Sequence, residues 1–305
     1  MRLALALLAA KTSTPYTSPM STKNSAILLV DCPDRKGLVA AVAEFLYTHN
    51  ANILHADQHQ DAERNVFLMR VEWDLTGFDF DLAYFPAVFG PIAARYSLRW
   101  RLEQSARRHR LALFVSKYDH CLSDLLYRHQ SGELACDIPL IVANHPDAER
   151  WATFHGIPFH LIPVEGKNKA EAEAKQIELL KANDIDLVIL ARYMQILSPR
   201  FVAEFPMRVI NVHHSFLPAF VGAKPYHRAF ERGVKLIGAT SHYVTDNLDE
   251  GPIIEQDVMR VSHRDNLDDL LTKGRDLEKA VLSRAVRWHI DHRILVSGNK
   301  TVVFD

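Results

Sequence analysis

Short apolar segments alternate with amphipathic segments of helical spacing from residue 111 onward, and this alternation restricts the possible folds more than any other feature. The expected elements are strand 111–116, helix 121–130, strand 138–143, helix 147–155, strand 159–162 and helix 169–183. The next segment, Leu187–Leu190, is apolar at every position, which is typical of a strand buried on both faces. The pattern predicts an α/β domain over residues 111–305 that contains a doubly wound, mostly parallel sheet.

The first third of the chain is expected to form a separate, smaller domain. Its elements follow the order strand, helix, strand, strand, helix, strand, at 26–30, 38–50, 52–60, 65–73, 79–96 and 97–103. This βαββαβ order predicts a ferredoxin-like domain over residues 24–104, followed by a polar, basic linker at 105–110. Pro86 and Pro91 are expected to break or kink the second helix, because proline lacks the backbone N–H group.

One apolar strand, 209–213, carries the residues that most suggest chemistry. Asn211 and His213 stand two positions apart in it, so their side chains should project from the same face. An acidic turn closed by Gly-Pro follows further along and supplies two candidate carboxylates, Asp246 and Asp249. An amide, an imidazole and a carboxylate can together add a nucleophile to a carbonyl group and stabilise the oxyanion that forms.

Composition argues against several classes of function. The chain of 305 residues has a formal net charge of −1, so nothing points to nucleic acid or to an anionic membrane surface as a partner. Its three cysteines are widely spaced and include no CxxC pair, which is typical of a protein from a reducing cytoplasm. Four histidines of the second domain, His213, His214, His227 and His242, lack a carboxylate at metal-ligand spacing, so no metal site is expected.

The first 23 residues are considered apart from the two domains. Leu3–Ala10 is a short apolar run that resembles the core of a signal peptide and is too short to span a membrane. The Ser/Thr/Pro-rich tract at 12–22 favours two other interpretations of residues 1–23, a disordered extension or a start upstream of the true initiator Met20.

Two sets of motifs resemble known families. N-x-H-x-S-x-L-P at 211–218 and D-x-x-D-x-G-P at 246–252 are similar to the folate-dependent formyltransferase superfamily. The local variants NVHHSFLPAF and GAKPYHRAF resemble the formyltetrahydrofolate deformylase family within it. DCPDRKGLVAAVAEFL at 31–46 resembles the opening of ACT domains, the small-molecule-sensing modules of amino-acid and one-carbon enzymes. An ACT-like module followed by a formyltransferase-like domain is the arrangement of the deformylase family.

The resemblance implies roles for individual residues. The catalytic residues that it implies are Asn211, His213 and Asp249, with Asp249 rather than Asp246 in the position of the family carboxylate. The implied folate-binding residues are Arg192, Met194, Ile196, Leu197 and Leu248. An amino-acid effector such as glycine or methionine is expected in the ACT-like module near Asp31, Asp34 and Gly37, or near Asn52 on the next strand. A module that serves only subunit pairing is the alternative.

The implied reaction is hydrolysis of 10-formyltetrahydrofolate to formate and tetrahydrofolate, which supplies formate for purine synthesis and balances the one-carbon folate pools. The folate is the substrate, so no cofactor is expected. ACT modules usually pair, which favours a homodimer or a homotetramer.

Three alternatives to hydrolysis are weaker. Formyl transfer to glycinamide ribonucleotide is disfavoured because no glycine occurs between Leu111 and Gln130, where such enzymes have a phosphate-binding loop. Transfer to methionyl-tRNA is disfavoured because the segment after the helix at 266–291 is a short strand pair without a basic excess. A folate- or amino-acid-responsive binding protein without activity is disfavoured because all three catalytic residue types are present.

Overall fold

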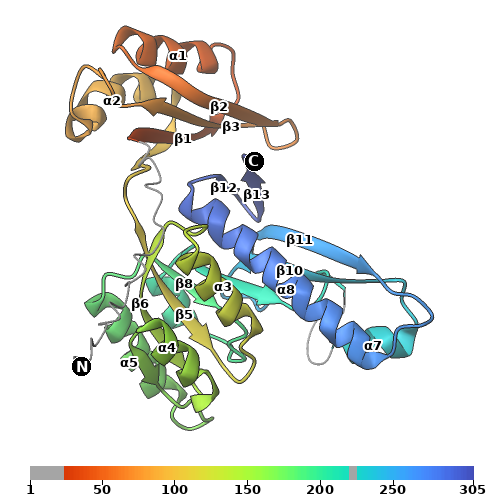
Figure 1. Cartoon of the computed structure of the whole chain (residues 1–305). Helices are drawn as coiled ribbons and strands as arrows, with labels where there is room; N and C mark the ends of the chain where they lie inside the picture. Colours follow the sequence, from red (N-terminus) through yellow and green to blue (C-terminus); the bar gives the residue numbers. More distant parts are fainter. Residues whose placement is uncertain (1–23, 220–224) are drawn as a thin grey trace, which may run out of the picture.

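A computed structural model of the chain describes residues 24–219 and 225–305 and contains two domains (Figure 1). The predictions for residues 1–23 lie outside the described residues. Among the helices that the structure describes, none is long and apolar enough to cross a membrane.

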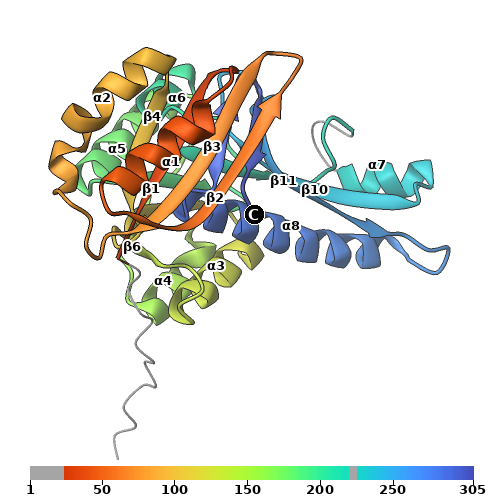
Figure 2. The same cartoon turned by 90° about the horizontal axis from the view of Figure 1, so that it is seen from above.

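The first domain has the predicted ferredoxin-like order. Its elements are β1 (Ser25–Pro33), α1 (Leu38–Thr48), β2 (Asn52–Asp61), β3 (Val66–Asp74), η1 (Leu82–Tyr84), α2 (Phe85–Tyr96) and β4 (Arg99–Gln104). The strands form one antiparallel sheet in the order β2-β3-β1-β4, and both helices lie over one face of it (Figures 1 and 2). The α/β prediction with a βαββαβ first domain is confirmed.

The second helix of this domain differs from its prediction. α2 runs through Pro91 to Tyr96 without ending, and Pro86 lies in its first turn, where the missing N–H group has no helical partner. Phe85 and Phe89 are fully buried and contact the aromatic core around Trp100. This packing offsets the hydrogen bond that Pro91 removes, so tertiary contacts override the local helix-breaking tendency.

The second domain contains a seven-stranded sheet with helices on both faces. Its strands are β5 (His109–Val115), β6 (Cys136–Ala143), β7 (Phe159–Leu161), β8 (Leu187–Leu190), β9 (Val209–His213), β10 (Leu236–Tyr243) and β11 (Ile253–Arg260). Its helices are α3 (His120–Gln130), η2 (Pro146–Ala148), α4 (Glu149–His155), α5 (Lys169–Ala182), α6 (Pro199–Glu204), α7 (Pro225–Arg232) and α8 (Leu267–Ile290). The strand order is β11-β10-β9-β8-β5-β6-β7, with β5 to β9 parallel to one another and β10 antiparallel to both of its neighbours, β9 and β11. The predicted doubly wound, mostly parallel sheet is confirmed.

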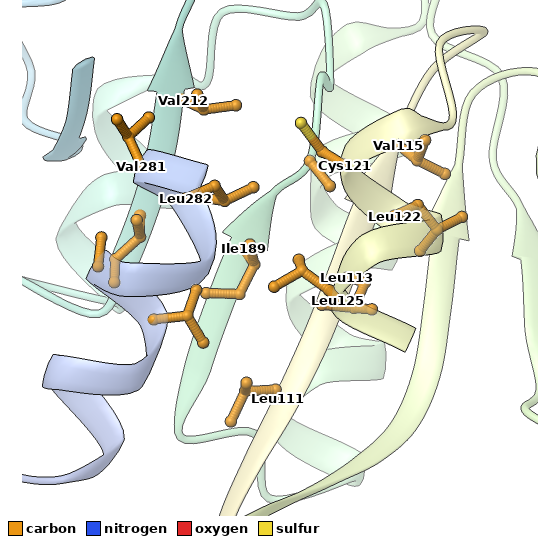
Figure 3. Packing of buried hydrophobic residues seen from close by; sticks show 14 of the residues in the cluster. Leu111, Leu113, Val115, Cys121, Leu122, Leu125, Ile189, Val212, Val281 and Leu282 are labelled. Atoms are coloured by element: carbon orange, nitrogen blue, oxygen red, sulfur yellow. The ribbon is translucent and has the colours of Figure 1, made fainter. Parts of the chain in front are cut away.

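Two hydrophobic clusters hold the helices to the two faces of this sheet. On one face, Ile189 and Val212 belong to the cluster that includes side chains of α3 and α8. Figure 3 shows Val281 of α8 beside Val212, and Leu125 of α3 near Leu113 of β5. On the other face, residues of β8 and β9 pack against α5 and α6. The alternation along β9 therefore directs Asn211 and His213 away from α8, because Ile210 and Val212 face it.

The junction of the two domains differs from the predicted boundary. β5 begins at His109, so it takes up the end of the predicted linker 105–110. The C-terminal hairpin, β12 (Ile294–Ser297) and β13 (Lys300–Val303), lies between the domains in Figure 1. Leu295 and Phe304 form a buried cluster with Ile27, Leu29 and Leu68 of the first domain. The C-terminal residues thus help to hold the first domain in place, although the predicted boundary assigned them to the second domain.

Three histidines lie near this junction, and His109 and His292 are buried. The Nε2 atoms of His109 and His292 lie 3.3 Å apart, and Nδ1 of His289 lies 2.7 Å from the Tyr243 hydroxyl oxygen. Burial lowers the pKa of all three imidazoles, to about 3 for His289 and to about 2 for His292. The folded chain therefore keeps these rings neutral at pH values where an unfolded chain protonates them.

Acid is expected to destabilise the fold through these rings. Below an ordinary histidine pKa of about 6.5 the unfolded chain binds protons that the folded chain does not, so this contribution to stability is lost as the pH falls. A His292→Gln chain should therefore lose about 2 kcal/mol less free energy of unfolding than the parent between pH 7 and pH 5. Urea denaturation of both chains at the two pH values measures this. Carboxylates such as Asp291, whose pKa is raised by burial, change the stability in the opposite direction as the pH falls. Both chains contain them, so their effect cancels in the comparison. Equal losses in the two chains would contradict the assignment.

Candidate active site

The three residues predicted to be catalytic line one cleft at the carboxyl end of the parallel strands. Asn211 and His213 lie on β9, and Asp249 lies in the loop between β10 and β11. The cleft has a volume of about 280 Å³. In an α/β sheet of this type, ligands bind beyond the carboxyl ends of the strands, where the connecting loops leave a crevice.

A short contact joins the imidazole to the carboxylate. Nδ1 of His213 lies 3.2 Å from Oδ2 of Asp249, and both side chains are more than nine-tenths buried. The other ring nitrogen, Nε2 of His213, is buried and makes no hydrogen bond with any described residue. A ring protonated on both nitrogens would donate to Asp249 through Nδ1 and would offer Nε2–H to a group in the cleft.

Asp249 remains ionised in this environment. Burial alone would raise the pKa of its carboxyl group, but the hydrogen bond from His213 and the nearby His242 ring together outweigh that effect and hold the pKa well below its usual range. The carboxylate is therefore a fixed negative charge at the base of the cleft over the whole neutral range. Such a group can accept hydrogen bonds from a water molecule and orient it.

His242 is a further member of the site that the sequence analysis did not assign to it. Residues 242 and 211 are cross-strand partners, and Nε2 of His242 lies 3.2 Å from Nδ2 of Asn211 and 3.7 Å from Oδ1 of Asp249. Its Nδ1 lies 2.9 Å from the carbonyl oxygen of Tyr243, which can only accept, so Nδ1 carries a proton. A neutral His242 therefore accepts from the Asn211 amide and fixes its orientation. Only the register between β9 and β10 reveals this contact.

The turn that carries Asp249 is held by a close backbone contact. Asp249 has a left-handed backbone (φ 57°), a conformation that Asp and Asn adopt more readily than most residues. At Gly251, a Cβ atom would overlap the carbonyl oxygen of Tyr243. The turn can approach β10 this closely only with glycine at this position.

A Gly251→Ala chain is expected to lose activity chiefly through displacement of Asp249. The added methyl group must push the turn away from Tyr243, and a shift of about 1 Å in a catalytic group can cost roughly 100-fold in rate. Overpacking of this kind destabilises a protein by about 1–3 kcal/mol. Steady-state kinetics and thermal denaturation measure the two effects. Wild-type kcat in the variant would show that the turn does not set the position of the carboxylate.

All five residues predicted to bind folate line the same cleft. They are Arg192, Met194, Ile196, Leu197 and Leu248. The side chains of Met194, Ile196 and Leu248 are 52%, 59% and 54% exposed, although all three are apolar. Exposed apolar side chains that gather around buried polar groups are typical of a site for a flat, partly apolar ligand.

A second polar cluster lies beside the cleft, toward α8. Glu278 is buried, its Oε2 lies 2.7 Å from Nε2 of His120, and its Oε1 accepts a hydrogen bond of 3.0 Å from the Tyr226 hydroxyl. Burial would raise the pKa of Glu278, but the His120 hydrogen bond and the Arg192 charge hold it below its ordinary value. His120, Cys121 and Glu278 have ligand atoms within 4.8 Å of one another. The arrangement is nevertheless that of an ion-pair network, because Nε of Arg192 lies 3.4 Å from Glu278 and would repel a metal cation.

Ser215 has a structural environment. Its hydroxyl donates a hydrogen bond of 2.7 Å to the carbonyl oxygen of Ala219, and its own carbonyl accepts one from Thr240. These bonds brace the loop that follows β9. They leave the serine in a position that does not suit a nucleophile, and no GxSxG motif surrounds it in the sequence.

The residues predicted to bind an effector lie at two opposite ends of the first sheet. Asp31 pairs with Arg99, Asp34 accepts a hydrogen bond from Gln60, and Gly37 precedes α1 with φ 92°, all at one end of the first sheet. Asn52 lies at the opposite end, because it pairs with Asp74 and through it with Ser25. The structure therefore separates the two alternative effector positions, and they cannot belong to one site within a chain.

Comparison with known proteins identifies the class of protein to which this fold and site belong. A family model described as formyl transferase matches residues 109–286, and one described as ACT domain matches residues 26–83. The fold and the site thus define a formyl transferase domain preceded by an ACT domain. A solved glycinamide ribonucleotide transformylase from Symbiobacterium toebii has 28% identity, covers 67% of this chain and 98% of its own, and has a TM-score of 0.61.

Two other relatives match nearly the whole chain. The formyltetrahydrofolate deformylase of Synechocystis is 56% identical over 280 residues, which are 92% of this chain and 98% of that protein. A crystal structure of a formyltetrahydrofolate deformylase from Pseudomonas syringae has 49% identity and a TM-score of 0.91, and it covers 94% of this chain and 96% of its own. The chain belongs to the formyltetrahydrofolate deformylase family, as its motifs predicted.

Proposed function

We propose that the cleft between β8, β9 and the 245–252 loop hydrolyses 10-formyltetrahydrofolate to formate and tetrahydrofolate. Membership of the deformylase family supports the reaction. The observation that carries the assignment of the site is the His213–Asp249 pair beside Asn211 in a cleft with apolar walls. The folate is the substrate, and we propose that the chemistry needs no cofactor and no metal.

The proposed reaction begins with a water molecule held by Asp249. The water oxygen attacks the formyl carbon and its proton passes to the Asp249 carboxylate, which is unprotonated over the whole neutral range. The carbonyl oxygen gains negative charge as the new C–O bond forms. Nε2 of His213, which is buried, and the amide of Asn211, which is half-buried, are the donors proposed for that oxyanion.

The second step breaks the bond between the formyl carbon and N10. N10 takes up a proton, delivered from Asp249 or His213 through water, and the formic acid that is formed loses its remaining proton to the solvent and leaves as formate. The exposed side chains of Met194, Ile196 and Leu248 are proposed to cover the pterin ring. Burial of that apolar surface supplies binding energy that is independent of the reacting atoms.

A formate assay with the folate as the sole substrate tests this proposal. The purified chain should release formate and tetrahydrofolate in equal amounts when no amine is present. A formyltransferase would release formate only slowly and would turn over when an amine acceptor is added. A binding protein would release none under either condition, and either of these two results would refute hydrolysis as the function.

We propose further that the ACT domain binds an amino-acid effector, glycine or methionine, at the end of its sheet near Asp31, Asp34 and Gly37. Gly37 opens α1 with a left-handed backbone, and backbone N–H groups at a helix start attract a carboxylate. Formate release measured with added glycine or methionine tests this. Parallel experiments with Asp34→Ala distinguish this end of the sheet from the Asn52 end, since only a site near Asp34 would lose its response.

A homodimer or homotetramer is proposed on the basis of an open sheet edge. β2 lies at the edge of the first sheet and is exposed along almost its whole length, with Ile53 and Leu54 39% and 50% exposed. Unpaired edge strands are ready to pair with another chain. Light scattering after gel filtration should give at least twice the chain mass of 34.7 kDa.

A cytoplasmic location is proposed because the three cysteines are free and buried.

A further inference from the structure

Arg192 is a buried cation at the edge of the catalytic cleft. It follows β8 directly and has a left-handed backbone (φ 63°), which is strained for a residue other than glycine. Its side chain is only 10% exposed, although it lines the cleft beside Asn211 and His213. Burial of a guanidinium group is costly unless its hydrogen bonds are satisfied, so a buried arginine at this position calls for a physical reason.

The contacts of the guanidinium satisfy it only in part. Nε lies 3.4 Å from Oε2 of Glu278, and Cζ lies 5.4 Å from the centre of the Tyr118 ring. Nε and Nη1 are both buried, and neither makes a hydrogen bond with a residue of the described ranges. Buried donors of a charged group are nearly always paired in native proteins, so these two nitrogens point to a ligand or a water molecule in the site.

The position of Arg192 relative to the sheet indicates which reactant it meets. The apolar walls of the cleft come from residues 193–197 and 244–248. The Arg192 side chain reaches to the other side, where Glu278 of α8 and Tyr118 of the loop after β5 lie. If the formyl group is held between His213 and Asp249, the folate that carries it lies against these apolar walls. The second reactant, which attacks the formyl carbon, must then approach past Arg192.

We propose that Arg192 selects water as the acceptor of the formyl group. This inference rests on the proposed hydrolysis. The guanidinium fills the space that a larger acceptor would need, and its fixed positive charge repels a protonated amine but not a water molecule. Nη1, which makes no hydrogen bond with a described residue, offers a donor to the oxygen of that water and, after reaction, to the formate anion formed from it. Arginine stays charged throughout, so it takes no proton from the reaction.

Substitution of Arg192 should change the charge of the site, because it leaves the negative charge of Glu278 without this partner. The carboxylate is buried and its pKa is held below the ordinary value by His120 and by Arg192. The charge of Arg192 also helps to lower the pKa of the nearby His214 to about 3, after the larger effect of burial. Without the guanidinium, the site would expose a negative group where a cationic amine enters. A pocket that repels amines would become one that attracts them.

A product-partition experiment tests this inference on the intact chain. The enzyme is supplied with 10-formyltetrahydrofolate and with glycinamide as a small amine, and formate and N-formylglycinamide are quantified together by mass spectrometry. In the transfer reaction the cationic amine first gives up a proton to the solvent; its neutral nitrogen then attacks the formyl carbon, the bond to N10 breaks, and N10 takes the second proton that the amine nitrogen loses. The parent chain should give formate and almost no formylated amine.

Arg192→Gly should raise the ratio of formylated amine to formate by about tenfold or more, the usual size of one lost interaction with a charged group. Glycine also relieves the backbone strain at φ 63°, so the variant is not expected to unfold. Arg192→Lys keeps the charge and should keep the partition of the parent. Arg192→Gln keeps most of the length and loses the charge, and it should shift the partition in the same direction as glycine.

Two results would overturn the inference. Arg192→Gly and Arg192→Gln chains that still yield formate alone would show that the arginine does not choose the acceptor. Folded variants that yield neither product would show that it serves the chemical step or folate binding, the role that the family resemblance implies. Failure of the parent chain to release formate without an amine is a separate outcome, because it refutes the proposed hydrolysis whatever the variants do.

Discussion

An Asp249→Asn chain is expected to lose about 10³-fold or more in kcat, in the upper part of the range for removal of a general base. Asparagine keeps the shape of the side chain and tolerates the left-handed backbone that Asp249 adopts, so the turn should hold its position. The change removes the negative charge that pairs with His213 at 3.2 Å and that orients the attacking water. Steady-state formate release measures the loss.

Asp246→Asn is the matched control for this experiment. Asp246 lies on the same turn and lines the same cleft, and the sequence alone left it as a competing carboxylate. Its substitution should lower kcat by less than about tenfold, as expected for a group outside the proton transfer. A nearly active Asp249→Asn chain beside an inactive Asp246→Asn chain would transfer the catalytic role to Asp246.

An Asn211→Ala chain is expected to lose about 10²–10³-fold in kcat, which corresponds to the loss of one oxyanion donor. The KM for the folate should change little, because the amide stabilises charge that develops only in the transition state. The amide also contacts His242 at 3.2 Å, so its removal frees that ring to turn toward Asp249. Kinetics at several folate concentrations separate the effects on kcat and KM.

Asn211→Ser provides a graded comparison. Serine keeps a shorter donor on the same strand, so its kcat should lie between those of the parent and the alanine variant. A rise in KM without any change in kcat would contradict the oxyanion role and would assign Asn211 to folate binding. Thermal denaturation of each variant excludes unfolding as the cause of lost activity.

Features set by local spacing were predictable from the sequence. Asn211 and His213 share a face because strand side chains alternate, and that rule needs no tertiary information. Leu187–Leu190 predicted a central strand because every position is apolar, and β8 lies between β5 and β9 in the sheet. The family resemblance supplied the choice of Asp249 over Asp246, which the residues alone did not decide.

Features set by register and by distant contacts were not predictable in the same way. His242 contacts Asn211 only because β10 pairs with β9 in one particular register. Arg192 meets Glu278 because α8 returns across the sheet to the end of β8, and no local pattern signals that return. The C-terminal hairpin was expected in the second domain, yet its Leu295 and Phe304 also complete a cluster with strands of the first. In each case the signal lies in the packing of segments far apart in the chain.

The most direct test of the central claim is the fate of the formyl carbon in water enriched in oxygen-18. The purified chain is supplied with 10-formyltetrahydrofolate alone, and the formate is analysed by mass spectrometry. Attack by solvent at the cleft of Asn211, His213 and Asp249 predicts formate with one heavy oxygen from every turnover, at a rate that Asp249→Asn nearly abolishes. Unlabelled formate, or labelled formate released equally fast by the Asp249→Asn chain, would contradict it.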